Sequence, residues 1–153
     1  VLIALGEAIR LASVACIGPK SRTRGSEVGR LVTWGPYGVC RNPIYVGNTA
    51  MWAGFGIWGG PAALACWLVF CGVQYSLVVS YEEAMLQKEH GLKYERYCRS
   101  TPRWMSLGPR VPVSRGQVSW RAAFLSESST FLAIAGLSLM TWAVGDFGVF
   151  SGQ

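Results

Sequence analysis

The feature that most constrains the fold is a run of 40 residues, from 42 to 81, that contains no Asp, Glu, Lys, Arg or His. A second such run covers residues 128–145. A helix that crosses a bilayer needs about 20 apolar residues, within a range of about 17 to 25. The first run therefore predicts two spans, 43–59 and 61–81, and the second predicts one, 128–145. Three such helices are too many for a soluble chain of 153 residues to bury.

Composition agrees with a membrane protein, because 51% of the residues are hydrophobic and only 14% are charged, whereas soluble domains average about 25% charged residues. The first 17 residues are apolar apart from Glu7 and Arg10. These two lie three positions apart, so on a helix they share one face and pair. We interpret residues 1–17 as a further span whose charged face points into the bundle. A signal peptide is the alternative, but its basic residues should precede the apolar core.

The positive charges are confined to two segments. Of 14 Lys and Arg residues, thirteen lie in 20–41 and 88–121, and the turn at 59–61 carries none. Both segments flank the uncharged hairpin on one side, which is the positive-inside pattern. This distribution predicts cytoplasmic segments 18–42 and 82–127 in a protein of the bacterial inner membrane, with both termini outside. The net charge of +6 then attracts anionic lipid headgroups to the basic segments. We therefore expect no nucleic-acid partner.

The predicted fold class is all-α: one polytopic domain over 1–153 with about four transmembrane helices. Pro43 and Pro61 each suit the first turn of a span, where a missing backbone N–H costs little. The helix of the third span should continue into the cytoplasm as far as Gly91, a plausible C-cap. A short helix with the sequence LKYERYCRS should follow and end before Pro102. Residues 120–127 read as an amphipathic lead-in to the last span.

The five cysteines form no CxxC pair, so we expect free thiols in a reducing environment. The single His90 builds no recognised metal site with them. We therefore predict no metal centre.

Two adjacent acids, Glu82 and Glu83, stand where the third span leaves the membrane. Neither has a basic residue three or four positions away, and two carboxylates so close to hydrocarbon destabilise each other. A positive group must therefore reach them from elsewhere in the fold or from a ligand. Arg41 begins the second span on the same side, so an antiparallel hairpin would place it opposite the acids. The alternatives are that the acids mark the exit into water and that Arg41 is a snorkelling anchor.

Aromatic residues and glycines nearby also allow two interpretations. Tyr45 is either a site residue or a residue of the interfacial aromatic belt. Gly54 and Gly56 would let a flat ligand approach the backbone, but small residues are also the ordinary packing device of membrane helices. Tyr94 and Tyr97 lie three positions apart. Their helix either covers a ligand or rests on anionic lipid.

Taken in order, these pieces resemble a known family. GPY, then RNPIYVGN, a glycine-bearing span, EE at the foot of the next span, and HGLKYERYCRSTPRW occur in succession over residues 35–104. The pattern resembles the integral-membrane methyltransferases of the isoprenylcysteine carboxyl methyltransferase and phospholipid methyltransferase superfamily. The resemblance implies S-adenosylmethionine as cofactor, bound without a Rossmann domain between membrane helices and a cytoplasmic C-terminal segment.

The resemblance also implies residue roles. The cofactor-binding set would be Asn42, Pro43, Tyr45, Gly54, Gly56, Glu82, Glu83, Tyr94 and Tyr97. Arg41 and Arg103 would occupy the family's arginine positions. Arg99 is a further candidate on chemical grounds, because a carboxylate acceptor needs an arginine to place it; these three arginines would count as catalytic. Pro102 would occupy the proline position before Arg103. Asn42 stands where many members have histidine; asparagine still donates and accepts hydrogen bonds but does not titrate.

The chemistry of the cofactor agrees with this set. An acid would bind the ammonium or the ribose hydroxyls, an arginine the carboxylate, and tyrosine faces the sulfonium. Methyl transfer needs mainly alignment of the two reactants. The implied acceptor is hydrophobic and dissolved in the membrane, an isoprenylcysteine-type carboxylate or a lipid-like substrate.

Two rival functions remain open. The first is a non-catalytic membrane subunit or binding module that retains the fold for a membrane-protein partner, which the Asn42 replacement favours. The second is a small transporter, which predicts polar residues deep inside the spans. The few that occur there, such as Asn48 and Gln74, are too sparse for a convincing pathway.

Overall fold

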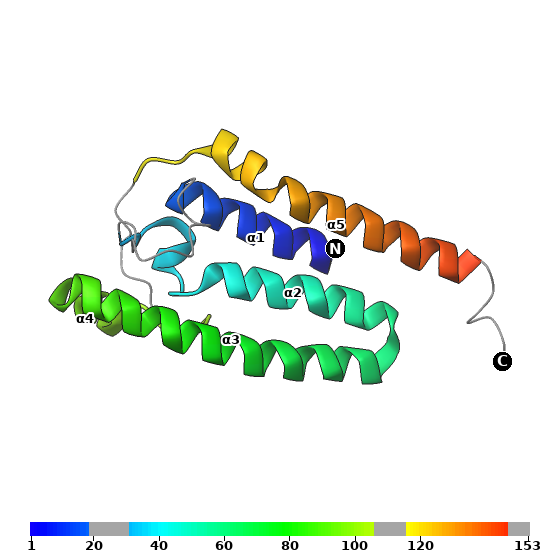
Figure 1. Ribbon diagram of the computed structural model, residues 1–153, viewed down its shortest axis with the longest axis horizontal. Helices are drawn as coiled ribbons and strands as arrows, with labels where there is room; N and C mark the ends of the chain where they lie inside the picture. Colours follow the sequence, from blue (N-terminus) through cyan, green and yellow to red (C-terminus); the bar gives the residue numbers. More distant parts are fainter. Residues whose placement is uncertain (19–30, 106–115, 147–153) are drawn as a thin grey trace.

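The computed structural model describes residues 1–18, 31–105 and 116–146, and all the regular structure in these ranges is helical. The helices are α1 (Leu2–Ile17), the 3₁₀ turn η2 (Gly35–Gly38), α2 (Pro43–Trp58), α3 (Gly60–His90), α4 (Leu92–Ser100) and α5 (Trp120–Asp146). The four longer helices lie side by side in the order α5, α1, α2, α3, as Figure 1 shows. The predicted all-α fold is confirmed.

Local sequence explains most helix boundaries. Pro43 and Pro61 lie in the first turns of α2 and α3, where a proline removes no helical hydrogen bond. Gly91 has a positive φ of 51° and ends α3, as a glycine C-cap does. As predicted, α3 runs past the apolar segment, and α4 covers Leu92–Ser100. The expected lead-in at 120–127 is continuous with the last span in the single helix α5.

Two helices, Gly60–His90 and Trp120–Met140, are long and apolar enough to cross a membrane. Only 17% and 11% of their apolar windows are buried inside the protein, so most of that surface faces outward, as it would toward lipid. The predicted spans 1–17 and 43–59 agree with α1 and α2 to within one residue, but these helices contain 16 residues each, just below the usual spanning range. Among the described residues, two of the four predicted spans therefore have the length and composition of a membrane-crossing helix.

The closest helix contact joins α1 to α2. A Cβ placed on Gly47 would lie 2.6 Å from the backbone oxygen of Gly6, and the reverse substitution meets an equal obstacle. Small residues let helix backbones approach in this way inside membranes. The small apolar core beside this crossing contains Val14, Ala15 and Ala123, and the last of these attaches α5 to α1.

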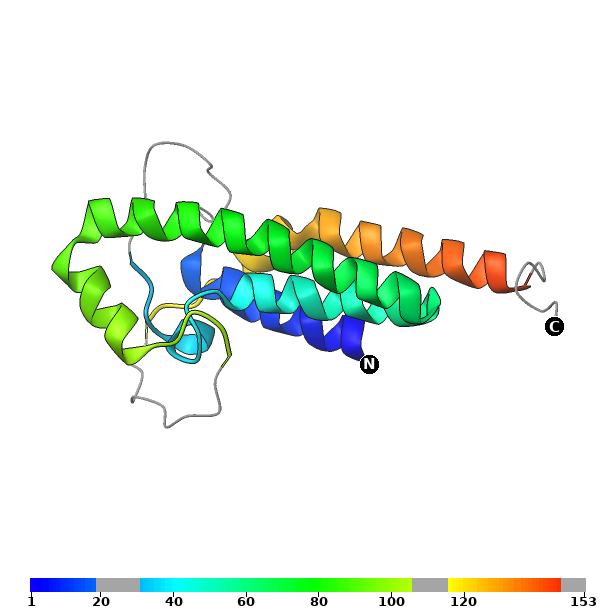
Figure 2. The same cartoon turned by 90° about the horizontal axis from the view of Figure 1, so that it is seen from below.

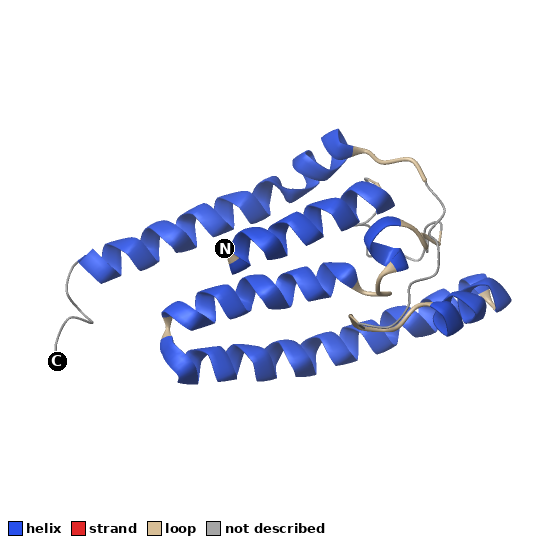
Figure 3. Cartoon of the chain, turned by 180° about the vertical axis from the view of Figure 1, so that it is seen from behind, coloured by secondary structure: helices blue, strands red, loops and turns tan. Residues whose placement is uncertain are grey.

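Connections and termini divide the bundle into two ends. Figure 2 shows η2, α4 and the start of α5 gathered at one end, with the N-terminus, the α2–α3 turn and the C-terminal end of α5 toward the other. Viewed from behind, α4 turns back beside the end of α3 (Figure 3). This arrangement matches the predicted hairpin topology. It collects the polar motif residues at one end, which we call the polar end.

Candidate functional site

Residues 39–42 connect η2 to α2, and we call this segment the join. It is hydrogen-bonded to the segment that follows α4. The backbone N–H of Arg41 donates to the carbonyl of Pro102 at 2.9 Å. The next side chain repeats the contact, because Nδ2 of Asn42 donates to the carbonyl of Arg103 at 3.1 Å. Two segments about sixty positions apart in sequence are thereby held side by side. Asn42 is buried, and its amide performs a structural task there.

Glu83 lies between two arginines at this join. Its Oε1 is 3.5 Å from Nη1 of Arg41, and its Oε2 accepts a hydrogen bond from Nη2 of Arg103. Only 12% of the Glu83 side chain and 14% of the Arg41 side chain are exposed, against 42% for Arg103. The predicted opposition of Arg41 and the acidic pair across the hairpin is thus confirmed. For Glu83, the positive charge that the acids were expected to require comes from the fold itself.

Glu82 has a different partner. The hydroxyl of Tyr45 donates to its Oε1 at 2.8 Å across the α2–α3 hairpin. The Tyr45 ring in turn lies 5.0 Å, centroid to centroid, from the ring of Tyr75 on α3. A hydrogen bond from an uncharged donor therefore holds Glu82 at a more exposed position, whereas ion pairs hold Glu83.

The helix α4 contributes two buried tyrosines, Tyr94 and Tyr97, whose ring centroids are 6.1 Å apart. The Tyr97 hydroxyl donates to the carbonyl of Tyr37 in η2 at 2.6 Å, so this residue docks α4 on the join. Burial raises the pKa of Tyr97 above the usual value of 10. Burial, followed by the nearby Glu83 carboxylate, likewise raises the pKa of Tyr94. Both rings are therefore neutral at physiological pH.

Tyr94 differs from Tyr97 in its hydroxyl. That atom is inaccessible to solvent and has no nitrogen or oxygen partner among the described residues; the thiol of Cys98 is its near neighbour. Arg41 also donates to the Cys98 sulfur. Arg41, Glu83, Tyr94 and Cys98 therefore form one buried cluster at the polar end, and Arg103 closes its outer side.

Among the predicted residues, Arg99, Gly54 and Gly56 lie away from this cluster and from the contacts described around it. Arg99 is 78% exposed and pairs with Glu95 at 2.6 Å, because it lies on the outer face of α4. A Cβ on Gly54 would lie 2.5 Å from the Ile3 side chain, and one on Gly56 would lie 2.8 Å from the Cα of Leu64. These glycines pack against α1 and α3, about 18 to 21 Å along α2 from Asn42 at a rise of about 1.5 Å per residue. Their roles toward a cofactor stay predictions.

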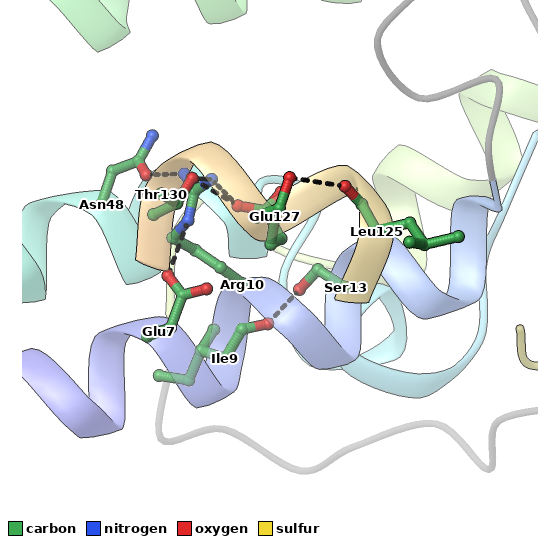
Figure 4. A network of polar contacts seen from close by, with 9 residues as sticks. Glu7, Ile9, Arg10, Ser13, Asn48, Leu125, Glu127 and Thr130 are labelled. Carbon is green, nitrogen blue, oxygen red and sulfur yellow. Dashed lines mark hydrogen bonds and ion pairs between the residues drawn. The ribbon is translucent and has the colours of Figure 1, made fainter. Parts of the chain in front are cut away.

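A second polar cluster was missed. The predicted Glu7–Arg10 pair forms at 3.3 Å, and Nη2 of Arg10 also reaches Glu127 of α5 at 2.5 Å. Figure 4 shows these groups converging with Asn48 and Thr130. Only 2% of the Glu127 side chain is exposed. Glu127 has no basic residue three or four positions away, so the reasoning applied to Glu82 and Glu83 would have found it.

An apolar cavity of about 480 Å³ borders the join on its other side. It is formed by α1, η2 and the start of α2, and its lining includes Ala12, Val39, Cys40, Pro43 and Val46. The volume falls in the usual range of ligand sites, about 300 to 1,000 Å³. The polar end therefore combines a charged cluster with an apolar cavity on either side of one short segment.

Comparison with known proteins identifies the family. The profile described as phospholipid methyltransferase matches residues 1–93, which include the join, the hairpin and the acidic pair. The chain belongs to the phospholipid methyltransferase family. This confirms the resemblance drawn from the sequence motifs. The matched range ends before the α4 tyrosines and Arg103. No solved structure matches the chain significantly.

Two curated relatives are metal-resistance proteins. The chain is 30% identical over 113 residues to the cobalt-zinc-cadmium resistance protein CzcN of Cupriavidus metallidurans, covering 73% of this chain and 50% of the relative. It is 30% identical over 97 residues to the nickel-cobalt-cadmium resistance protein NccN of Alcaligenes xylosoxydans xylosoxydans, covering 63% and 44%. The chain thus spans about half the length of these relatives. Among the residues that the structure describes, no group of three or more His, Cys, Asp or Glu side chains could hold a metal ion.

Proposed function

We propose that this member of the phospholipid methyltransferase family transfers a methyl group from S-adenosylmethionine to a hydrophobic acceptor dissolved in the membrane. The observation that carries the proposal is Glu83, held between Arg41 and Arg103 at the polar end of the bundle. Together with Glu82 these groups present two positive and two negative charges. The amino-acid end of the cofactor carries an ammonium and a carboxylate, and each of these finds a partner of opposite sign here.

When the cofactor enters, its charged groups must replace some of the ion pairs of Glu83. The exposed fractions of the three side chains indicate which pair opens first. Arg103 is the most exposed of the three paired groups, so its guanidinium can turn toward the cofactor carboxylate at the least desolvation cost. Glu83 then receives the ammonium while Arg41 stays in place. The buried Tyr94 and the Tyr45 ring supply aromatic surface for the sulfonium. These residues bind and orient the donor; alignment of methyl donor and acceptor supplies much of the rate.

The acceptor is proposed to approach from the apolar side of the join. The 480 Å³ cavity is lined almost entirely by apolar groups, which suits the hydrocarbon part of an isoprenylcysteine-type or lipid-like molecule. In this arrangement the cofactor arrives from the cytoplasm and the acceptor from the bilayer of the inner membrane.

Calorimetric titration of the detergent-solubilised protein with S-adenosylmethionine tests the proposal. Glu83→Gln should weaken binding by a factor of about 10 or more, the loss of one charge-assisted contact of about 1.5 to 3 kcal/mol. Glu95→Gln is the matched control, because that acid pairs with Arg99 on the exposed face of α4 and should change nothing. Absence of binding by the parent protein at millimolar cofactor would refute the enzyme proposal.

A second candidate function is a non-catalytic subunit or binding module that keeps the methyltransferase fold. The names of CzcN and NccN favour a role in metal resistance, and the Asn42 amide is engaged by a backbone carbonyl. Incubation with radiolabelled methyl donor and native lipid extract separates the two. A labelled lipid product supports methyl transfer, whereas cofactor binding without any product supports the binding module.

A further inference from the structure

A second cavity, of about 240 Å³, lies deeper in the bundle than the candidate site. It opens between α2 and α5 over α1. Its lining residues are Arg10, Asn48, Met51, Trp52, Phe55, Ser129, Thr130, Ala133, Ile134 and Leu137. Its first α2 residue, Asn48, follows Asn42 by six positions, which is about 9 Å along the helix. The cavity is therefore separate from the cluster around Arg41 and Glu83.

The lining residues are polar at one side of the cavity and apolar at the other. Both α2 and α5 begin at the polar end of the bundle (Figure 1), and the polar lining residues come first on each, Asn48 on α2 and Ser129 with Thr130 on α5. Farther along, the walls are Phe55 on one side and Leu137 on the other. An occupant must match this polarity, with a polar group toward the cytoplasmic end and hydrocarbon beyond it.

Beside Asn48 and Thr130, each nitrogen of the Arg10 guanidinium already faces a protein oxygen, and its Nε forms an ion pair with Glu7 without a hydrogen bond. Its Nη1 donates to Oδ1 of Asn48, and its Nη2 reaches Glu127 at 2.5 Å and Thr130 at 3.4 Å. Its Nε lies 3.3 Å from Glu7. Figure 4 shows the guanidinium enclosed by these oxygens. An amide oxygen and a hydroxyl oxygen each have two lone pairs, so Asn48 and Thr130 retain the capacity to accept from an occupant.

The charge of the network has the same consequence. Glu7 and Glu127 surround a single guanidinium, so their formal sum with Arg10 is −1 in a largely buried place. A further anion would be repelled with little solvent screening. A carboxylate or phosphate head has no donor to offer and adds negative charge, whereas a hydroxyl or an ammonium donates and adds none.

We propose that this cavity binds an amphiphile with one hydrocarbon chain and a non-anionic, hydrogen-bond-donating head. The head would donate to Asn48 and Thr130, and the chain would lie along Met51, Phe55 and Leu137. The volume is below the usual range for ligand sites, which favours one chain over the two of a phospholipid. The site does not depend on methyl transfer and would exist in a non-catalytic relative as well.

Photolabelling in nanodiscs without methyl donor tests this proposal, with a dodecanol analogue that carries a diazirine on its chain as the probe. Labelled peptides should come from residues 51–55 and 133–137. Excess dodecanol or dodecylamine should reduce that labelling at least fivefold, and dodecanoate should reduce it far less. Equal competition by dodecanoate, or labelling that no amphiphile reduces, overturns the proposal.

Two matched substitutions identify the site. Ala133→Phe fills the cavity and should abolish competable labelling, whereas Leu132→Phe adds a ring at a neighbouring position that is 74% exposed and outside the lining and should leave labelling intact. Thr130→Val removes one acceptor at nearly constant shape and should weaken dodecanol competition several-fold. Equal labelling of both Phe variants and undiminished competition in the Val variant would refute the site, whatever the result of the cofactor titration.

Discussion

The two adjacent glutamates look alike in sequence, yet the structure predicts that their removal has very different costs. Glu83→Gln takes the negative charge from between Arg41 and Arg103. At 3.5 Å and an effective dielectric constant of about 20, the Arg41–Glu83 attraction alone is about 5 kcal/mol before desolvation. Removing one partner of a buried pair costs about 3 to 5 kcal/mol. The half-exposed Arg103 adds little, so we expect a loss of about 3 kcal/mol.

Glu82→Gln should cost far less. The amide oxygen of glutamine still accepts the hydrogen bond that the Tyr45 hydroxyl donates at 2.8 Å, and among the described residues no ion pair of Glu82 is lost. The hydrogen bond changes from a charge-assisted one of about 1.5 to 3 kcal/mol to a neutral one of about 0.5 to 1.5 kcal/mol, so we expect a loss of about 1 kcal/mol. The two variants should therefore differ by about 2 kcal/mol, or roughly 30-fold in the unfolding equilibrium.

Unfolding by sodium dodecyl sulfate in mixed micelles measures this difference. A double-mutant cycle with Arg41→Gln isolates the pair: if the Arg41–Glu83 contact carries the effect, the two single losses should not add. If the Glu82→Gln and Glu83→Gln variants are equally stable, or if the cycle is fully additive, Glu83 is solvated in the absence of ligand. The described burial of Glu83 between Arg41 and Arg103 would then be wrong.

Two other predictions follow from packing and ionisation. Gly47→Ala should destabilise the bundle by about 1 to 3 kcal/mol, because the new methyl group meets the backbone of Gly6; Gly72→Ala, with open space around it, is the control in the same unfolding assay and should be neutral or slightly stabilising. Tyr97→Phe should cost about 1 kcal/mol through the lost hydrogen bond to Tyr37. Because burial raises the pKa of Tyr97 in the folded state, its contribution to the free energy of unfolding should be fully present below about pH 10 and fall above it. The Phe variant should therefore show a shallower decline of stability in unfolding titrations at high pH.

The sequence predicted the helices well because their signals are local. Uncharged runs set the lengths, Pro43 and Pro61 the starts, and Gly91 the end of α3. The opposition of Arg41 and the acidic pair also followed, since an antiparallel hairpin leaves no other place for them. The bounds of α1 and α2 were also predicted to within one residue.

Contacts between distant segments could not be predicted. Nothing local states that Glu83 pairs with Arg103 as well as Arg41, or that Glu127 finds Arg10 across the bundle; both depend on how α4 and α5 return to the first helices. The choice between Arg99 and Arg103 depended on which face of the polar end each occupies, and only three-dimensional placement decides it. The glycines illustrate the same difficulty, since one motif serves helix packing and ligand approach alike.

The unequal helix lengths have a consequence for the surrounding lipid. At 1.5 Å per residue, the 16 residues of α2 extend about 24 Å and the 31 residues of α3 about 46 Å. A typical hydrocarbon layer is about 30 Å thick, so a bilayer crossed by α2 must thin by about 6 Å beside it, while α3 protrudes. Hydrophobic mismatch of this kind draws the lipid surface inward toward the short helices. The leaflet would then be dimpled where Arg41 and Asn42 precede α2, and lipid headgroups would descend toward the polar cluster.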